Sequence, residues 1–210
     1  ADGSILIAAD KELWLKTKKN FEKIPCQFDG KIALAAYGTD YIILSGGGPA
    51  RGGGIWRLSR RQGADPAFVP LVKDSLDNQV PFRSPLKTGA LSVIDSEEKT
   101  VWIGCGEALC RYRDGGVDTF DERRGVPREV WRALVVAADG SLIARSDGKL
   151  VIVAANGGVH VEEIPYGLPE YFRQQPTEVF LLHMADGSLV TPGHDSLIVR
   201  SSAGHWDDID

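Results

Sequence analysis

The chain has 210 residues, a formal net charge of −5 and 43% hydrophobic residues. The acidic balance argues against a nucleic-acid-binding surface, because neutralising phosphates requires clustered cations. No stretch approaches the roughly 18 consecutive apolar residues of a membrane-spanning helix, so we expect no membrane segment in this chain. The 24 glycines and 11 prolines predict many turns, and therefore many short elements.

The tripeptide Asp-Gly-Ser recurs along the chain, and each copy precedes a short apolar run. The three copies occupy residues 2–4, 139–141 and 186–188. Asp-Gly favours a tight hairpin turn, because glycine accepts the positive φ that such turns require. Other turn residues at Asp40 and Asp95 precede similar runs, YIILSG and TVWIGC. Successive aspartates of this set lie roughly 40–55 residues apart, which matches the length of a four-stranded propeller blade.

Each of these turns is expected to join two strands of one repeat. Upstream of the turns lie near-continuous apolar runs, which are typical of strands buried on both faces, at 32–37, 90–94, 133–138 and 180–185. Downstream, a second series of segments follows at a similar offset, at 12–16, 54–58, 108–112, 149–153 and 196–200. A weaker fourth strand ends each repeat. We therefore expect each repeat to form an antiparallel four-stranded sheet, with no helix between residues 90 and 155.

The repeats predict an all-β fold, a β-propeller made of four-stranded antiparallel blades. The predicted blades span residues 1–30, 31–72, 90–121, 130–164 and 178–210, and residues 73–89 form a long connector. Because the chain opens at the turn that follows an inner strand, the first blade lacks its inner strand and the other four are complete. We interpret the chain as part of a larger propeller, with Ala1 and Asp210 as limits within a longer protein.

Residues 91–153 carry a more specific pattern. Asp95 is followed by Val-Trp-Ile-Gly at 101–104, Leu-Cys-Arg-Tyr at 109–112 and Gly-Val-Pro at 125–127. This order resembles the two-component-regulator propeller repeat, although Cys105 stands where that family has threonine. The resemblance implies a periplasmic sensor domain of a bacterial signalling protein, of the histidine kinase or diguanylate cyclase type, anchored in the inner membrane. It implies a non-catalytic domain that binds a small molecule or a partner.

Cations gather in the segments expected on one rim of the propeller. Turns between second and third strands share that rim with the connectors between blades, and long connectors are usually functional or disordered. On an acidic protein, such a rim indicates an anionic or carbohydrate-like ligand or a partner surface. The alternative is that these charges serve only to keep the protein soluble. The candidate residues are Arg51, Arg83, Lys87, Arg124, Arg128, Tyr171, Phe172 and Arg173.

Two of the three cysteines, Cys105 and Cys110, flank a predicted hairpin turn. If they face each other, a disulfide across the strands is geometrically possible and compatible with the periplasm. A shift of one residue in the strand register would leave two buried thiols instead. Both alternatives stay open at this point.

Spaced catalytic or metal-binding residues are not found in the sequence, so we expect no enzyme activity, no metal and no cofactor. A propeller hydrolase or lactonase would need ionisable side chains on its inner strands, where only His183 occurs. A further alternative is a scaffold for protein contacts. The aliphatic strand at 4–9 is expected to have an unpaired edge, which we expect to be covered either by a second copy of the chain, as a homodimer, or by a segment that this chain lacks.

Overall fold

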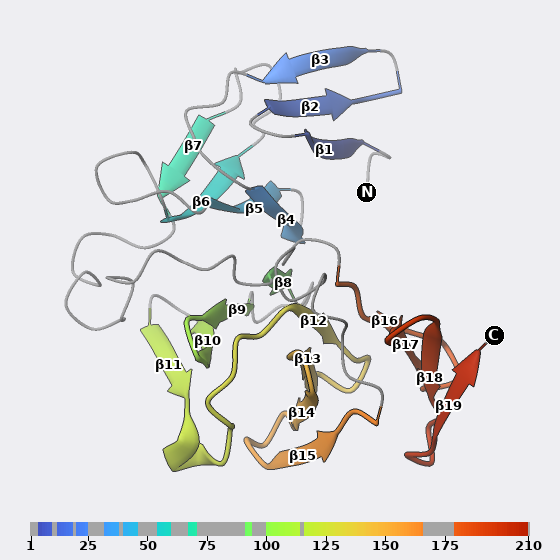
Figure 1. Ribbon diagram of the computed structural model, residues 1–210. Coiled ribbons are helices and arrows are strands. Elements are labelled where there is room, and N and C mark those ends of the chain that lie inside the picture. The colour runs from blue at the N-terminus through green and yellow to red at the C-terminus, as the bar shows by residue number, and fades with distance from the viewer. Residues whose placement is uncertain are drawn as a thin grey trace.

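The computed structural model describes residues 4–9, 12–18, 20–24, 32–37, 40–45, 54–59, 67–70, 91–93, 100–113, 116–165 and 179–209. These segments form five antiparallel sheets, which follow one another in chain order around an open arc (Figure 1). Both termini lie on the open side of the arc. Among the described segments, no helix is long and apolar enough to cross a membrane.

The first sheet has three strands and the second has four. The first contains β1 (Ile5–Ala9), β2 (Glu12–Lys16) and β3 (Phe21–Ile24). The second contains β4 (Ile32–Tyr37), β5 (Asp40–Ser45), β6 (Gly54–Ser59) and β7 (Ala67–Pro70). In both sheets the strands pair in sequence order, as expected for hairpins joined by short turns.

The remaining three sheets repeat the four-stranded plan. The third contains β8 (Leu91–Val93), β9 (Val101–Cys105), β10 (Ala108–Arg113) and β11 (Gly116–Phe120). The fourth contains β12 (Ala133–Val136), β13 (Leu142–Arg145), β14 (Lys149–Val153) and β15 (Val159–Glu163). The fifth contains β16 (Leu182–His183), β17 (Leu189–Pro192), β18 (Leu197–Arg200) and β19 (Trp206–Ile209). The first strands β4, β8, β12 and β16 neighbour one another in turn around the arc.

The predicted all-β propeller architecture is confirmed. The third sheet has four antiparallel strands, as expected, and β12 starts the next sheet. The first sheet begins with what is the second strand of the other sheets, so it lacks an inner strand in the described part of the chain.

Two details differ from the sequence-based expectation. One turn of 3₁₀-helix, η3 (Glu122–Arg124), lies in the connector after β11, where no helix was expected. It forms because the Asp121 carboxylate caps its first turn and Gly125 ends it at a φ of 84°. The second difference is β16, which has only two residues and leaves Leu182 52% exposed. This sheet ends the arc, so no described sheet covers its outer face.

The core is divided among the interfaces between neighbouring sheets. Along β13 and β14, alternate residues point to opposite faces, so Val151 packs toward the third sheet and Leu150 toward the fifth. The interface between the third and fourth sheets also contains Trp102, Phe120 and Trp131, all nearly or fully buried. The fourth sheet is therefore held by apolar contacts on both of its faces.

The first sheet exposes aliphatic side chains on its outer face. Leu6 and Ala8 pack toward the second sheet, whereas Ile5 and Ile7 are exposed by 53% and 39%. Within the described residues, β1 pairs with β2 alone. The expected unpaired aliphatic edge is therefore present in this part of the structure.

An ion pair joins the fourth and fifth sheets. The Arg200 Nε of β18 donates a hydrogen bond of 2.7 Å to Glu162 Oε2 of β15, and both side chains are mostly buried. The hydrogen bond from Arg200 lowers the pKa of the Glu162 carboxyl, with a smaller contribution from its attraction to the arginine charge. A lowered carboxyl pKa stabilises the fold above the unfolded pKa, and this stabilisation is lost as the pH falls through the folded pKa.

We predict that Glu162→Gln lowers the free energy of unfolding by about 1–3 kcal/mol at neutral pH, because the buried arginine loses its charged partner. The difference from wild type should shrink as the pH is lowered below about 4. Denaturant unfolding at several pH values measures this. The neighbouring Glu163 is 76% exposed, so Glu163→Gln is the control and should change stability little. Equal losses in the two variants would contradict the assignment.

Candidate functional site

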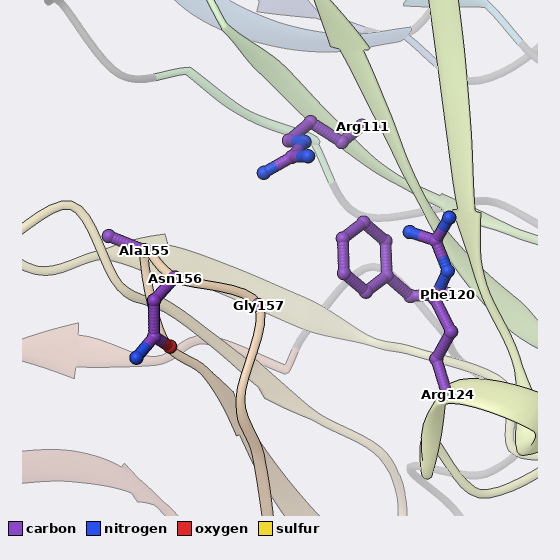
Figure 2. A pocket seen from close by; sticks show the side chains of 6 residues that line it. All are labelled: Arg111, Phe120, Arg124, Ala155, Asn156 and Gly157. Atoms are coloured by element: carbon purple, nitrogen blue, oxygen red, sulfur yellow. The ribbon is translucent and has the colours of Figure 1, made fainter.

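A hollow of about 410 Å³ lies between the third and fourth sheets. Its residues are Arg111, Phe120, Arg124, Ala155, Asn156 and Gly157. Figure 2 shows Arg111, Phe120 and Arg124 on one side, and the turn that carries Asn156 on the other. We call this feature the inter-sheet hollow.

Arg111 is held in place by one carboxylate and two aromatic rings. It lies on β10 directly opposite Asp118 of β11, whose Oδ2 accepts hydrogen bonds from Nε at 3.2 Å and Nη2 at 2.8 Å. The guanidinium carbon is 5.5 Å from the Trp102 ring centroid and 5.2 Å from that of Phe120. Such contacts orient a guanidinium and reduce the entropy that it loses on binding a ligand.

Arg124 approaches the same ring from the connector. The 3₁₀ turn reverses the chain after Phe120, since the Val126 backbone N–H donates to the Asp121 carbonyl at 3.0 Å. This places the Arg124 guanidinium carbon 4.7 Å from the Phe120 centroid. In the described part of the chain, this guanidinium has no ion pair or side-chain hydrogen bond, so its donors remain available.

The opposite wall is the tight turn between β14 and β15. The Gly157 backbone N–H donates to the Ala154 carbonyl at 2.8 Å, and Asn156 Oδ1 accepts from the Gly158 backbone N–H at 3.0 Å. This internal hydrogen bond uses the amide oxygen of Asn156 and leaves its amide nitrogen as a donor. Gly157 adopts a φ of 89°, which a side chain would disfavour.

The lining of the inter-sheet hollow therefore offers donors and positive charge. It contains two guanidinium groups and one carboxamide, and neither a carboxylate nor a histidine is among the lining residues that the structure describes. Asp118 offsets the charge of Arg111, whereas Arg124 has no such partner in the described structure. This set can bind an acceptor-rich or anionic group.

Two of the rim candidates from the sequence lie within the described residues. Arg124 lines the hollow, whereas Arg128 is exposed and forms an ion pair with Glu107 in the turn between β9 and β10. That pair places the connector after β11 beside the turn between β9 and β10 of the same sheet. The other candidates lie outside the described residues: Arg51, Arg83, Lys87, Tyr171, Phe172 and Arg173.

The sequence analysis missed Arg111, Phe120 and Asn156. One pattern could have identified Arg111, because it stands two residues after Leu109 and so shares the face that turns toward the next sheet. A charged side chain on a buried face usually has a specific partner or role.

The disulfide is present between Cys105 at the end of β9 and Cys110 in β10, with Cα atoms 5.8 Å apart. The two cysteines are diagonal neighbours on one face, since Cys105 pairs with Ala108 and Cys110 with Ile103. The bond therefore links the two strands immediately before Arg111.

The described histidines do not form a catalytic or metal-binding group. His160 contacts Glu162 at 3.0 Å, and His194 contacts the exposed Asp195 at 2.9 Å. No cluster of three or more histidine, cysteine or acidic side chains in the described residues could hold a metal ion.

Comparison with known proteins shows similarity in structure but not in sequence. No family model matches the chain, and no curated protein matches its sequence. The virginiamycin B lyase of Staphylococcus aureus is similar, with a TM-score of 0.69 and 13% identity over 100% of this chain and 67% of the lyase.

A second neighbour is the extracellular domain of a protein from B. thetaiotaomicron that is described as a one-component system. It has a TM-score of 0.67 and 12% identity, and the match covers 99% of this chain and 26% of that chain. A streptogramin B lyase matches with a TM-score of 0.59 and 10% identity over 88% of this chain, which spans 56% of the lyase. At these identities the comparisons establish the propeller fold alone, because one fold serves many functions.

We predict that replacing both cysteines, Cys105→Ser with Cys110→Ser, lowers the free energy of unfolding by about 2 kcal/mol, as expected for closing a short loop. Denaturant unfolding with and without reductant measures this effect. Reductant should destabilise wild type by a similar amount and leave the double variant unchanged. A wild-type chain that is insensitive to complete reduction would contradict the prediction.

Proposed function

We propose that this chain is a non-catalytic, ligand-binding part of a sensory β-propeller, which belongs to a bacterial membrane-bound signalling protein of the histidine kinase or diguanylate cyclase type. The observation that carries the proposal is the inter-sheet hollow, whose lining contains fixed donors and positive charge. The repeat pattern at 91–153 and the similarity to an extracellular domain of a signalling protein support the sensory role.

The chemistry of the hollow favours an anion over a carbohydrate. Sugars commonly stack on exposed aromatic faces, but Phe120 is 2% exposed and already contacts two guanidinium groups. Arginine donors match carboxylate and phosphate oxygens in geometry and charge. We therefore propose a small organic acid or phosphate-bearing ligand, which Arg111 and Arg124 bind from one side and the Asn156 amide from the other.

The disulfide supports a location outside the cytoplasm. Such bonds persist in oxidising compartments and are rare where thiols are kept reduced. The structural neighbour from B. thetaiotaomicron is an extracellular domain. We propose that the chain functions in the periplasm, where a sensor domain meets solutes from outside the cell.

A second candidate function is a contact surface between protein copies. The outer faces at both ends of the arc expose apolar side chains, with Ile5 and Phe21 on the first sheet and Leu182 and Leu197 on the fifth. Large exposed apolar patches commonly mark interaction surfaces. We propose that a second copy covers the free edge and outer face of β1.

The ligand proposal is tested by a thermal-shift screen with phosphate, small carboxylic acids and neutral sugars. We predict that an acid or phosphate raises the Tm of wild type, and that Arg124→Glu abolishes this rise without lowering the Tm of the free protein. The matched control is Arg123→Glu, which makes the same charge change one residue away. Equal weakening in both variants, or a rise with neutral sugars alone, would contradict the proposal.

The contact-surface proposal is tested by light scattering over a range of protein concentrations. We predict that the wild-type mass rises toward a dimer and that Ile7→Lys remains a monomer, because a charge at this face opposes strand pairing. Val161 is exposed on a strand of the fourth sheet, so Val161→Lys is the control and should associate as wild type does. A wild-type chain that stays monomeric at every concentration would exclude this function.

A further inference from the structure

Arg145 is a charged residue in an apolar interface. It ends β13 and pairs with Ala133 on one side and Leu150 on the other, on the face that turns toward the fifth sheet. Its side chain is 0% exposed. This interface lies on the opposite face of the fourth sheet from the inter-sheet hollow, so the two features are separate.

The hydrogen bonds of Arg145 reach only neutral acceptors. Nη1 donates to Thr191 Oγ1 of β17, and Nε donates to the Ser146 carbonyl at 3.4 Å. The Thr191 hydroxyl in turn donates to the Phe180 carbonyl at 2.7 Å. The third nitrogen, Nη2, is buried and has no hydrogen-bond partner among the described residues.

The neighbouring carboxylate is already used by another arginine. Asp147 accepts hydrogen bonds from Arg132 Nε at 3.0 Å and Arg132 Nη2 at 3.3 Å. Among the described residues, no carboxylate forms an ion pair with Arg145. The group of Arg132, Arg145 and Asp147 therefore carries a net positive charge.

An unpaired buried charge is costly. Burial lowers the pKa of Arg145 to about 10, partly opposed by Asp147, so the guanidinium is still protonated at neutral pH. Proteins bury such charges with an ion of opposite sign, because the desolvation penalty otherwise reaches several kcal/mol. Here Nη2 carries two N–H donors, is buried away from water, and has no acceptor among the described residues.

We propose that Arg145 Nη2 binds a small inorganic anion between the fourth and fifth sheets. Two of the three guanidinium nitrogens already have acceptors, so one nitrogen serves the ion. This favours a spherical, halide-sized anion over a planar carboxylate that requires two parallel bonds. Complete burial of the side chain limits the ion to the same small size. The anion would neutralise the site and stabilise the contact between β13 and β17.

This anion site is separate from the inter-sheet hollow, so it does not depend on the proposed ligand-binding function. The test is thermal unfolding of the whole chain in sodium chloride and in sodium gluconate at the same ionic strength, since gluconate is too large for the site. Wild-type Tm should rise by a few degrees as chloride replaces gluconate, because an anion that binds the folded state alone stabilises it. Identical Tm values in the two salts would overturn the proposal.

Two variants at the same interface separate specific binding from a general salt effect. Arg145→Met should lose the chloride response and keep at least the wild-type Tm in gluconate, because a buried unpaired charge is replaced by an apolar side chain. Arg200→Met should lower the Tm in both salts and keep the chloride response, because Arg200 already has Glu162 as its partner. A chloride response that persists in Arg145→Met would overturn the proposal.

A direct measurement covers the case in which Arg145→Met does not fold. Crystals of the wild-type chain soaked in bromide should show an anomalous peak within hydrogen-bond distance of Arg145 Nη2. Bromide peaks confined to the protein surface would overturn the proposal. Arg124→Glu should keep the chloride response of wild type, and its loss in that variant would count against a site at Arg145.

Discussion

The stacking of thin sheets on both faces is the constraint on which the rest of this structure depends. A four-stranded sheet has too little apolar surface to form a core alone, so it needs a neighbour on each side. The fourth sheet shows this, with Val151 and Val153 packed toward the third sheet and Ile143 and Leu150 toward the fifth. The end sheets have one described neighbour each, and there Ile5 and Leu182 remain exposed.

Because the described interfaces between sheets are apolar, a polar side chain that lies in one of them needs hydrogen-bond or charge partners. Glu162 of the fourth sheet and Arg200 of the fifth form an ion pair with each other. Arg111 forms a hydrogen bond with Asp118 and contacts two aromatic rings, at the edge of the interface where the hollow opens. Arg145 donates hydrogen bonds to neutral acceptors only, through two of its three nitrogens, in the described structure. Of these three arginines, only Arg145 has a buried nitrogen without an acceptor among the described residues.

The repeat architecture could be predicted because its causes are local. Asp-Gly turns and alternating apolar residues act over a few positions, so strand order and the missing inner strand of the first sheet followed from the sequence. The short β16 did not follow from the sequence. Leu182 belongs to an apolar run typical of a buried strand, and it is exposed because its sheet lies at the end of the arc. The candidate site was only partly predicted, since Arg124 was named but Arg111, Phe120 and Asn156 were not. Their proximity depends on how two sheets pack, and no local pattern encodes that.

The position of the charges also bears on how a bound ligand would affect the contact between two sheets. Arg111 and Arg124 lie on the third sheet and its connector, while Asn156 belongs to the fourth sheet. A ligand bound by all three would therefore join two sheets whose described interface contains a large apolar cluster. Since apolar contacts are non-directional, neighbouring sheets can shift relative to each other at small cost, whereas charge-assisted hydrogen bonds fix one arrangement. A ligand that binds one arrangement better shifts the population toward it, by as much as its difference in affinity between the arrangements. In this architecture the interface between sheets, rather than any single sheet, is the element that a ligand can bias.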